Sequence, residues 1–404
     1  MKLSRLLRWP ILLIVLAVLL ASTSGCVCGG PPRATSWTDL TLQDDKIYAA
    51  DLQQIQILGT DGELIQSVPE NSDDNTAGLI YVAPAVGEGY LIVAGQNPPQ
   101  GFLSQATYPV VKLDIETGKE LWSFGPKNDK GQYVGGAQGQ YIEGGVISDG
   151  TFVIGNSDGN VYALDVDTGD LKWQFKTDHR VWATPLIADG IVYIGSMDHH
   201  LYALRLSDGE ELWKFAAPGD GAFASTPALQ DGILYIGTFA NRVYAIDADN
   251  GTEIWRFPAE KPGDSWFWGS PAVDGDAVYA VDVKGTVYKL DAGTGEEFWH
   301  SKLAPKKSND KDAPVRGGPA LTEDGSTLLI SSENGTLYAL DVDDGSEMWA
   351  EEGEGKGYVT PVVDGDIVYQ ALIQGSYRIR ALEITDDGDE LWVYPLPEES
   401  ETGE

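Results

Sequence analysis

The chain has 404 residues, of which 42% are hydrophobic, and its formal net charge is −35. So large an excess of carboxylates excludes a nucleic-acid-binding protein and adhesion of the folded part to anionic lipid, because like charges repel. The acidity is compatible with high solubility outside the cytoplasm or with a salty habitat. The length alone would allow two or three domains.

The first residues form a targeting segment. Three basic side chains precede an apolar run over residues 10–21, which is too short to predict a membrane span. Small residues then lead to Cys26, as in a bacterial lipobox, where the cysteine becomes the acylated first residue. We expect a lipoprotein signal peptide over residues 1–25, lipidation at Cys26 and a Gly/Pro tether over residues 26–35. An ordinary signal peptide and an uncleaved anchor are the alternatives.

Both cysteines of the chain, Cys26 and Cys28, lie in this segment. The folded body is therefore expected to have no disulfide and no thiol chemistry. Cleavage after residue 25 would remove three positive charges and leave a mature charge of −38. The expected location is extracytoplasmic, on the cell surface or in the periplasm, with contact to the membrane only through the lipid.

From residue 36 onward the chain repeats one pattern. A short apolar strand is followed by an Asp-rich turn that ends in Gly, and a Trp stands four residues after that Gly. The seven tryptophans, which are expected to dock between blades, are Trp122, Trp173, Trp213, Trp255, Trp299, Trp349 and Trp392. They are 40 to 51 residues apart, and a β-patterned repeat of this period indicates a propeller rather than independent domains.

An eighth, degenerate copy lies at the front of the repeat. Gly62 occupies the turn position there, but Gln66 stands where a Trp is expected. We therefore predict an all-β fold, an eight-bladed β-propeller of four-stranded antiparallel blades over residues 36–395, followed by an acidic tail over residues 396–404. The last blade has its own outer strand at 391–394, so closing the ring requires no exchanged N-terminal strand.

One repeat predicts the four strands of a blade. After Pro185 comes a first strand, and strands at 191–195, 201–204 and 211–215 follow, separated by turns rich in Asp and Gly. The Gly before each Trp is expected at positive φ, where a Cβ would clash. An Ala on the third strand is expected to leave room beside the indole; these alanines are Ala163, Ala203, Ala245, Ala339 and Ala381.

The pattern Ala-Leu-Asp-x-x-Thr-Gly-x-x-x-Trp resembles the tryptophan docking motif of pyrroloquinoline-quinone (PQQ) type propeller repeats, over about residues 36–395. Dehydrogenases of that group typically have adjacent cysteines over the cofactor, calcium ligands and an Asp base. This chain has no cysteine in its body, and no single Asp stands out among those in turns. The resemblance therefore implies the scaffold without catalytic residues, PQQ or calcium.

Within that family the chain resembles the non-catalytic lipoprotein branch, which includes the propeller lipoprotein of the outer-membrane assembly machine. This implies a monomeric scaffold that binds a protein partner or a small ligand. A PQQ-dependent dehydrogenase-type oxidoreductase is the alternative. No Cys or His cluster has the spacing of a metal site.

Strands in a blade alternate in direction, so the loops between blades share one face with the hairpins between second and third strands. We call this the inter-blade face. Its seven loops carry nine Lys or Arg and twelve Asp or Glu, a net of −3. The opposite face is crowded with Asp in its hairpins. We expect a nearly neutral inter-blade face and a strongly acidic opposite face.

The inter-blade loops also repeat a large side chain, three residues before a recurring Pro or its equivalent. The set is Trp37, Tyr81, Trp182, Trp268, Arg316 and Tyr358, with Phe223 beside the small Ala224. We expect these residues to ring the mouth of the central channel, where aromatics and one Arg suit a flat or sugar-like ligand or a partner's peptide. Alternatively, they only pack blade against blade.

One inter-blade loop carries a basic run, made up of Lys302, Lys306, Lys307 and Lys311. Such a run is either a solvated loop or a surface for an acidic partner.

Overall fold

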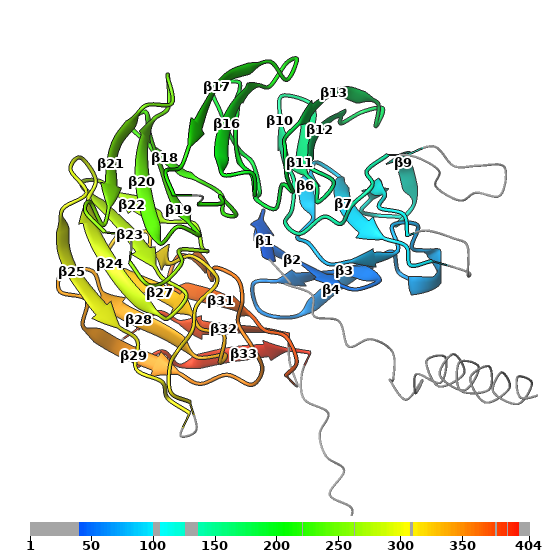
Figure 1. The fold of residues 1–404 in the computed structure, drawn as a ribbon. Helices are drawn as coiled ribbons and strands as arrows, with labels where there is room; N and C mark the ends of the chain where they lie inside the picture. The colour runs from blue at the N-terminus through cyan, green and yellow to red at the C-terminus, as the bar shows by residue number, and fades with distance from the viewer. Residues whose placement is uncertain are drawn as a thin grey trace, which may run out of the picture. The chain divides into compact units, whose positions relative to one another are not determined.

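The computed structural model describes residues 40–99, 106–125, 136–219, 221–261, 263–307, 310–375, 378–385 and 387–395. These residues form eight antiparallel sheets that follow one another round a ring (Figure 1), which confirms the eight-bladed propeller. The predicted signal peptide, Cys26, the tether, Trp37 and the acidic tail lie outside the described residues. No helix in the described part is long and apolar enough to cross a membrane.

The strands are numbered in chain order. The first four blades contain β1 (Leu40–Gln43), β2 (Lys46–Asp51), β3 (Gln54–Gly59), β4 (Leu64–Val68); β5 (Leu79–Ile80), β6 (Ala85–Gly87), β7 (Tyr90–Gln96), β8 (Val110–Asp114), β9 (Glu120–Phe124); β10 (Val146–Ser148), β11 (Thr151–Gly155), β12 (Asn160–Asp165), β13 (Leu171–Lys176); and β14 (Leu186–Ala188), β15 (Ile191–Gly195), β16 (His200–Arg205), β17 (Glu211–Ala216). A short 3₁₀ helix, η1 (Ser72–Asp74), precedes β5.

The remaining four blades have the regular four-stranded pattern. They contain β18 (Ala228–Gln230), β19 (Ile233–Thr238), β20 (Arg242–Asp247), β21 (Glu253–Phe257); β22 (Ala272–Asp274), β23 (Ala277–Val281), β24 (Thr286–Asp291), β25 (Glu297–Lys302); β26 (Ala320–Leu321), β27 (Thr327–Ser331), β28 (Leu337–Asp341), β29 (Glu347–Glu351); and β30 (Val362–Asp364), β31 (Ile367–Ala371), β32 (Ile379–Glu383), β33 (Glu390–Tyr394).

The fourth blade shows how local chemistry sets the strands. β14 and β15 are joined by Asp189 and Gly190, whose φ angles of 51° and 74° suit the two-residue hairpin turn that Asp-Gly favours. The apolar residues of β15 and β16 are buried on both faces, as expected for strands packed between neighbouring blades. Sheet order β14-β15-β16-β17 matches the predicted order along the chain.

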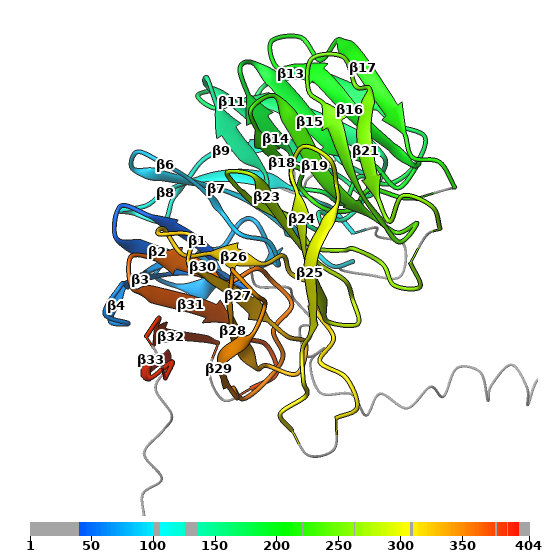
Figure 2. The same cartoon turned by 90° about the vertical axis from the view of Figure 1, so that its left-hand side faces the viewer.

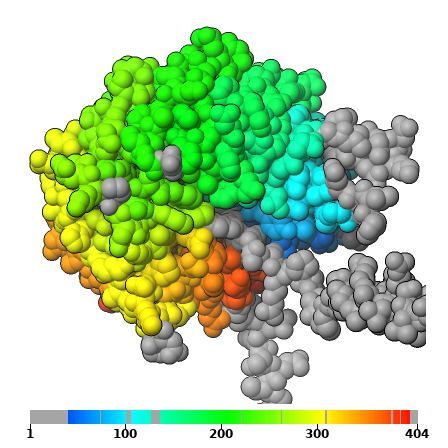
Figure 3. All heavy atoms as spheres, viewed as in Figure 1, coloured from blue at the N-terminus to red at the C-terminus, as the bar shows by residue number. Residues whose placement is uncertain are grey.

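First strands surround the ring axis. β1 contacts β6, β6 contacts β10, β10 contacts β14, and β26 contacts β30. The side view shows β1, β26 and β30 next to one another (Figure 2). In the space-filling view the colours follow chain order round the ring, so blades that are consecutive in sequence pack side by side (Figure 3). The inter-blade loops, which precede the first strands, are therefore brought together at the axis.

The recurrent tryptophans bridge neighbouring blades. The indole N–H of Trp173 donates to the carbonyl oxygen of Leu206 in the next blade at 2.7 Å, and Ala163 lies directly opposite Trp173 in the strand register. Four other tryptophans make the same bond to the next blade: Trp122 to Val166, Trp213 to Ala248, Trp255 to Ala292 and Trp299 to Val342. Each bond joins an outer strand to the residue that follows the third strand of its neighbour.

The glycine prediction is confirmed, and the structure adds a second reason for it. Positive φ angles of 67–82° occur at Gly62, Gly118, Gly169, Gly209, Gly251, Gly295, Gly345 and Gly388. A Cβ on Gly209 would also lie 2.7 Å from Cδ2 of Trp173, well inside van der Waals contact. The indole of one blade thus lies flat on the turn glycine of the next, where no other side chain fits.

The junction between the first two blades has no Trp. There, Gln66 Nε2 donates to Ile115 O at 2.6 Å, and Ile115 corresponds to Leu206 because both follow a third strand. The second sheet holds an unpredicted fifth strand: β5 pairs with β7 of its own blade, while Ile80 N donates to Leu52 O of the first blade at 2.6 Å. This junction lacks a docked indole but has a strand bonded to both blades.

The ring closes by packing between the last and first blades. Trp392 Nε1 donates to Thr60 O at 3.0 Å, and a Cβ on Gly62 would lie 2.5 Å from the Trp392 ring. Buried residues of both blades, including Leu58 and Tyr369, share one apolar cluster. The last sheet is built from β30–β33 and the first from β1–β4, as the sequence predicts.

Buried tyrosines predict alkaline unfolding. Burial, which disfavours a charged phenolate, is the largest cause that raises the pKa of Tyr279, Tyr338 and Tyr369 to about 12 from an ordinary value near 10. The unfolded chain therefore loses these protons first, and stability that is present below pH 10 is lost as the pH rises through 12. Urea unfolding midpoints should fall steeply between pH 10 and pH 12.

Tyr369→Phe provides a matched control for this effect. Its hydroxyl has no hydrogen-bond partner among the described residues, so the change should be nearly neutral at pH 7. Above pH 10 the variant should lose less stability per pH unit than the wild type, because one titrating phenol is gone. Midpoints that do not change between pH 10 and pH 12 would contradict the prediction.

Candidate functional site

Inter-blade loops of six successive blades line a cavity of about 180 Å³ at the ring axis. The loops lead into β10, β14, β18, β22, β26 and β30. The lining residues mainly occupy the three positions before the recurring Pro: Glu143, Thr184, Ala224–Thr226, Trp268–Ser270, Arg316–Gly318 and Tyr358–Thr360. The repeat therefore builds the wall of one cavity from the same positions of different blades.

We call the residues predicted to ring the mouth of the central channel the rim residues. The structure brings three of them together. The guanidinium of Arg316 lies 5.3 Å from the ring centre of Trp268 and 5.5 Å from that of Tyr358. Arg316 Nε donates to Glu333 Oε2 at 3.2 Å, and the hydroxyl of Tyr358 donates to Glu333 Oε1 at 3.2 Å. Lys356 Nζ is 3.8 Å from the same carboxylate. One arginine is thus held between two aromatic rings and a carboxylate at the cavity wall.

Two further aromatic residues extend this cluster outward. The ring of Trp266, 48% exposed, stacks on Phe239 at 5.2 Å between centres and 20° between planes. Phe239 also lies 5.0 Å from Trp268. Trp266, Phe239 and Trp268 therefore form a continuous row of rings from the cavity wall to solvent, which we call the aromatic platform.

Sequence reasoning missed Glu333, Phe239 and Trp266. Glu333 and Phe239 lie near the start of the hairpin between second and third strands, two residues after β27 and one residue after β19, and each contacts the large inter-blade residue of the next blade. Ser157 does the same by accepting from Trp182 Nε1 at 3.1 Å. The hairpins share the inter-blade face, so this repeated position was available as a signal.

The other predicted rim residues are placed differently. Trp182 is half-buried, with the Arg180 guanidinium 5.8 Å from its ring, and Tyr81 is half-buried with a pKa raised by burial. Phe223 is fully buried against Phe215 in the core between two blades. The expectation that Phe223 lies at the rim is corrected: it packs blade against blade, because its neighbour Ala224 takes the cavity position.

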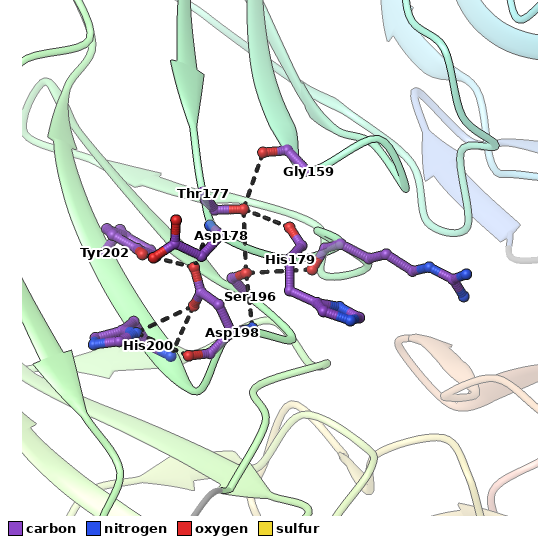
Figure 4. Close-up of polar contacts among 9 residues, drawn as sticks. Gly159, Thr177, Asp178, His179, Ser196, Asp198, His200 and Tyr202 are labelled. Carbon is purple, nitrogen blue, oxygen red and sulfur yellow. Dashed lines mark hydrogen bonds and ion pairs between the residues drawn. The ribbon is translucent and has the colours of Figure 1, made fainter.

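A polar network holds the inter-blade loop that carries Trp182 (Figure 4). The carboxylate of Asp198 accepts from the Tyr202 hydroxyl at 2.7 Å and from the backbone N–H of Asp178 at 2.9 Å. Thr177 Oγ1 donates to Gly159 O, and so ties the same loop to the preceding blade. Burial first, and then the bond to Asp198, raises the pKa of Tyr202 well above its usual range. These bonds fix the backbone of the loop that carries Trp182.

The basic run is largely used within the protein. Lys306 pairs with Glu347, Lys307 donates to Asn334 O and to Gly353 O, and Lys302 donates to Lys284 O. Three of these four lysines thus anchor the loop instead of extending into solvent, and this favours the interpretation as a structural loop over a surface for an acidic partner.

The described residues do not fit the calcium and PQQ site of the quinone-dependent dehydrogenases. The described residues contain no group of three or more His, Cys, Asp or Glu that could hold a metal ion. Cys26 and Cys28, the two cysteines of the sequence, precede the propeller. No catalytic step is therefore derived through calcium or PQQ.

A family model described as outer membrane protein assembly factor BamB matches residues 107–285, 198–309 and 283–402. A relative of that name from Xanthomonas campestris pv. campestris is 33% identical over 109 residues, which cover 24% of this chain and 25% of the relative. The matched segment thus spans about a quarter of the length of that relative.

Solved structures show the same fold at low identity. BamB from Moraxella catarrhalis has a TM-score of 0.66 at 17% identity, covering 87% of this chain and 97% of that chain. The computationally designed Ika8 protein has 0.65 at 16%, covering 87% and 98%. A europium-containing methanol dehydrogenase has 0.62 at 15%, covering 80% and 79%. These similarities show the propeller fold. They do not show an activity, which depends on the residues of the site.

Proposed function

We propose that this chain, which belongs to the family described as outer membrane protein assembly factor BamB, is a non-catalytic binding protein and scaffold. It is lipid-anchored through Cys26 on the extracytoplasmic side of a membrane, after removal of residues 1–25. Residues 26–35 serve as the tether. Its partner, a protein or a small ligand, meets the inter-blade face.

The observation that supports this proposal is that Trp268, Arg316 and Tyr358 come together at the wall of one cavity at the ring axis. The repeat alone requires large side chains only where blades pack. Here they line an open cavity of about 180 Å³, and the arginine among them is oriented by a carboxylate. Convergent polar groups in a largely preformed aromatic cavity are the usual features of a binding site.

The triple variant Trp182→Ala/Trp268→Ala/Arg316→Ala should lose the partner. Full-length protein is cross-linked in its own membranes, and the partner band is compared with that of the wild type. We expect at least a tenfold loss of the cross-linked band, because the ring stacking and charge that recognise the partner are removed. Leu212→Ala/Phe298→Ala/Leu391→Ala, on the exposed outer strands, is the matched control and should keep the band.

Melting curves decide between binding and packing. If the rim variant unfolds many degrees below the wild type, the rim residues act by packing; Arg316→Met then tests the charge alone at similar volume. Dye-linked oxidation of methanol or glucose after addition of PQQ and calcium would refute the non-catalytic function. An intact cross-linked band in a fully folded rim variant would refute the choice of face.

A further inference from the structure

We propose that the axial cavity and the aromatic platform form one site for a neutral oligosaccharide. One sugar ring occupies the cavity beside Trp268, and a following ring lies on the exposed ring of Trp266, which Phe239 supports from its other side. The inference rests on the proposed function, since it names the class of ligand that the inter-blade face takes.

The cavity suits a single ring rich in hydroxyl groups. Its volume of about 180 Å³ is below the range of roughly 300–1,000 Å³ that drug-sized ligands occupy. Hydroxyl side chains recur on its wall at the position before the Pro, in Thr184, Thr226, Ser270 and Thr360. These four residues come from four blades, and Thr360 Oγ1 accepts from Gly318 N–H at 2.7 Å.

Ser225 adds a polar group that awaits a partner. It lines the cavity and is 5% exposed, and its Oγ has no hydrogen-bond partner among the described residues. A buried polar group left unpaired costs about 1–3 kcal/mol. Ser225 Oγ is itself shielded from solvent, so pairing with a ligand hydroxyl requires rotation of this side chain into the cavity; that bond would recover the cost, whereas an apolar ligand would not.

The charges at the cavity favour a neutral ligand. Arg316 and Glu143 both line it, and Glu333 binds Arg316 from the side. The cations Arg316 and Lys356 balance the carboxylates Glu143 and Glu333, so this charge pattern favours neither an anion nor a cation, and an apolar ligand would leave the polar wall unpaired. Adjacent hydroxyls of a sugar match planar guanidinium and carboxylate groups, which form paired hydrogen bonds.

The platform extends the site beyond one ring. The large hydrophobic side chains that are exposed elsewhere in the described chain lie on the outermost strand of their blades, whereas Trp266 lies on an inter-blade loop. The exposed position of Trp266 does not recur in the described part of the other blades, so the packing of the repeat does not account for it. Flat aromatic rings bury large apolar area at low entropic cost, and the C–H face of a sugar ring is a flat apolar surface.

A peptide that binds by strand addition fits this geometry less well. In that mode of recognition an extended peptide adds a strand to an exposed sheet edge. The cavity wall is made of loops packed backbone to backbone: a Cβ on Gly269 would lie 2.3 Å from Gly317 C, and one on Gly317 would lie 2.4 Å from Val359 C. No strand edge is therefore presented by this part of the wall.

The test is titration of the purified full-length protein with maltotetraose, cellotetraose, mannotetraose and chitotetraose, and with tetragalacturonate as the acidic counterpart. Tryptophan fluorescence and calorimetry measure binding. At least one neutral tetrasaccharide should bind saturably, and tetragalacturonate should not. Trp266→Ala should weaken binding about tenfold, and Ser225→Ala about fivefold, since it removes one hydrogen bond. Phe298→Ala, a 55% exposed aromatic on β25, should change nothing.

Several outcomes would overturn the inference: no neutral tetrasaccharide binds, only tetragalacturonate binds, or Trp266→Ala and Phe298→Ala weaken binding equally. If the sugars fail while the rim-dependent cross-link persists, the scaffold function stands and this ligand class is refuted. If a bound sugar is oxidised in the dye-linked assay, the non-catalytic function is refuted and the sugar site stands.

Discussion

Gly209→Ala is expected to destabilise the propeller by about 3 kcal/mol, and Gly190→Ala by only about 1 kcal/mol. The two glycines have nearly the same φ, 75° and 74°, so both substitutions incur the cost of a left-handed backbone. A Cβ on Gly209 would lie 2.7 Å from the Trp173 ring, whereas one on Gly190 meets nothing within 4 Å. The difference isolates the clash with the docked indole. Urea unfolding of both variants measures it.

A double variant shows whether the clash is the cause. In Trp173→Ala/Gly209→Ala the methyl group no longer meets an indole, so the second substitution should cost about 1–2 kcal/mol, as at Gly190. Equal effects of Gly209→Ala and Gly190→Ala would show that the indole does not restrict the turn. Additive costs in the double variant would lead to the same conclusion.

Trp392→Ala should weaken the closure of the ring and cost about 3 kcal/mol, near the lower end for a Trp removed from a core. The indole joins the last blade to Thr60 and Gly62 of the first, and no covalent connection joins these blades. Urea unfolding measures the loss. Amide exchange should also accelerate in β1 and β33, since these strands flank the opened junction.

Two further variants make this prediction specific. Leu391→Ala, next in sequence and 47% exposed, should change stability by less than about 0.5 kcal/mol. Trp392→Gln should recover part of the loss, because Gln66 makes the equivalent backbone bond to Ile115 at the junction that lacks a Trp. Unchanged stability of Trp392→Ala would show that the ring closes through its other contacts, such as the cluster around Leu58 and Tyr369.

The candidate site was only partly predictable. The repeat placed Trp268, Arg316 and Tyr358 at equivalent loop positions, and the structure brings these three to one cavity. The repeat did not predict the position of Phe223, which lies one residue away from the equivalent position and is buried in the core. In a strand, side chains alternate with period two, but an irregular loop has no such period, so one residue more or less decides between rim and core.

The sequence by itself determined the fold, the blade number and the turn glycines. These depend on local turn chemistry and strand alternation, and the same local pattern occurs in every repeat. Contacts between blades depended on tertiary structure. Glu333 meets Tyr358 and Phe239 meets Trp268 across junctions between blades, and β5 bridges two blades. Such contacts join residues 25 or more positions apart on loops of unequal length. Their geometry is fixed only when the ring brings the loops to its axis.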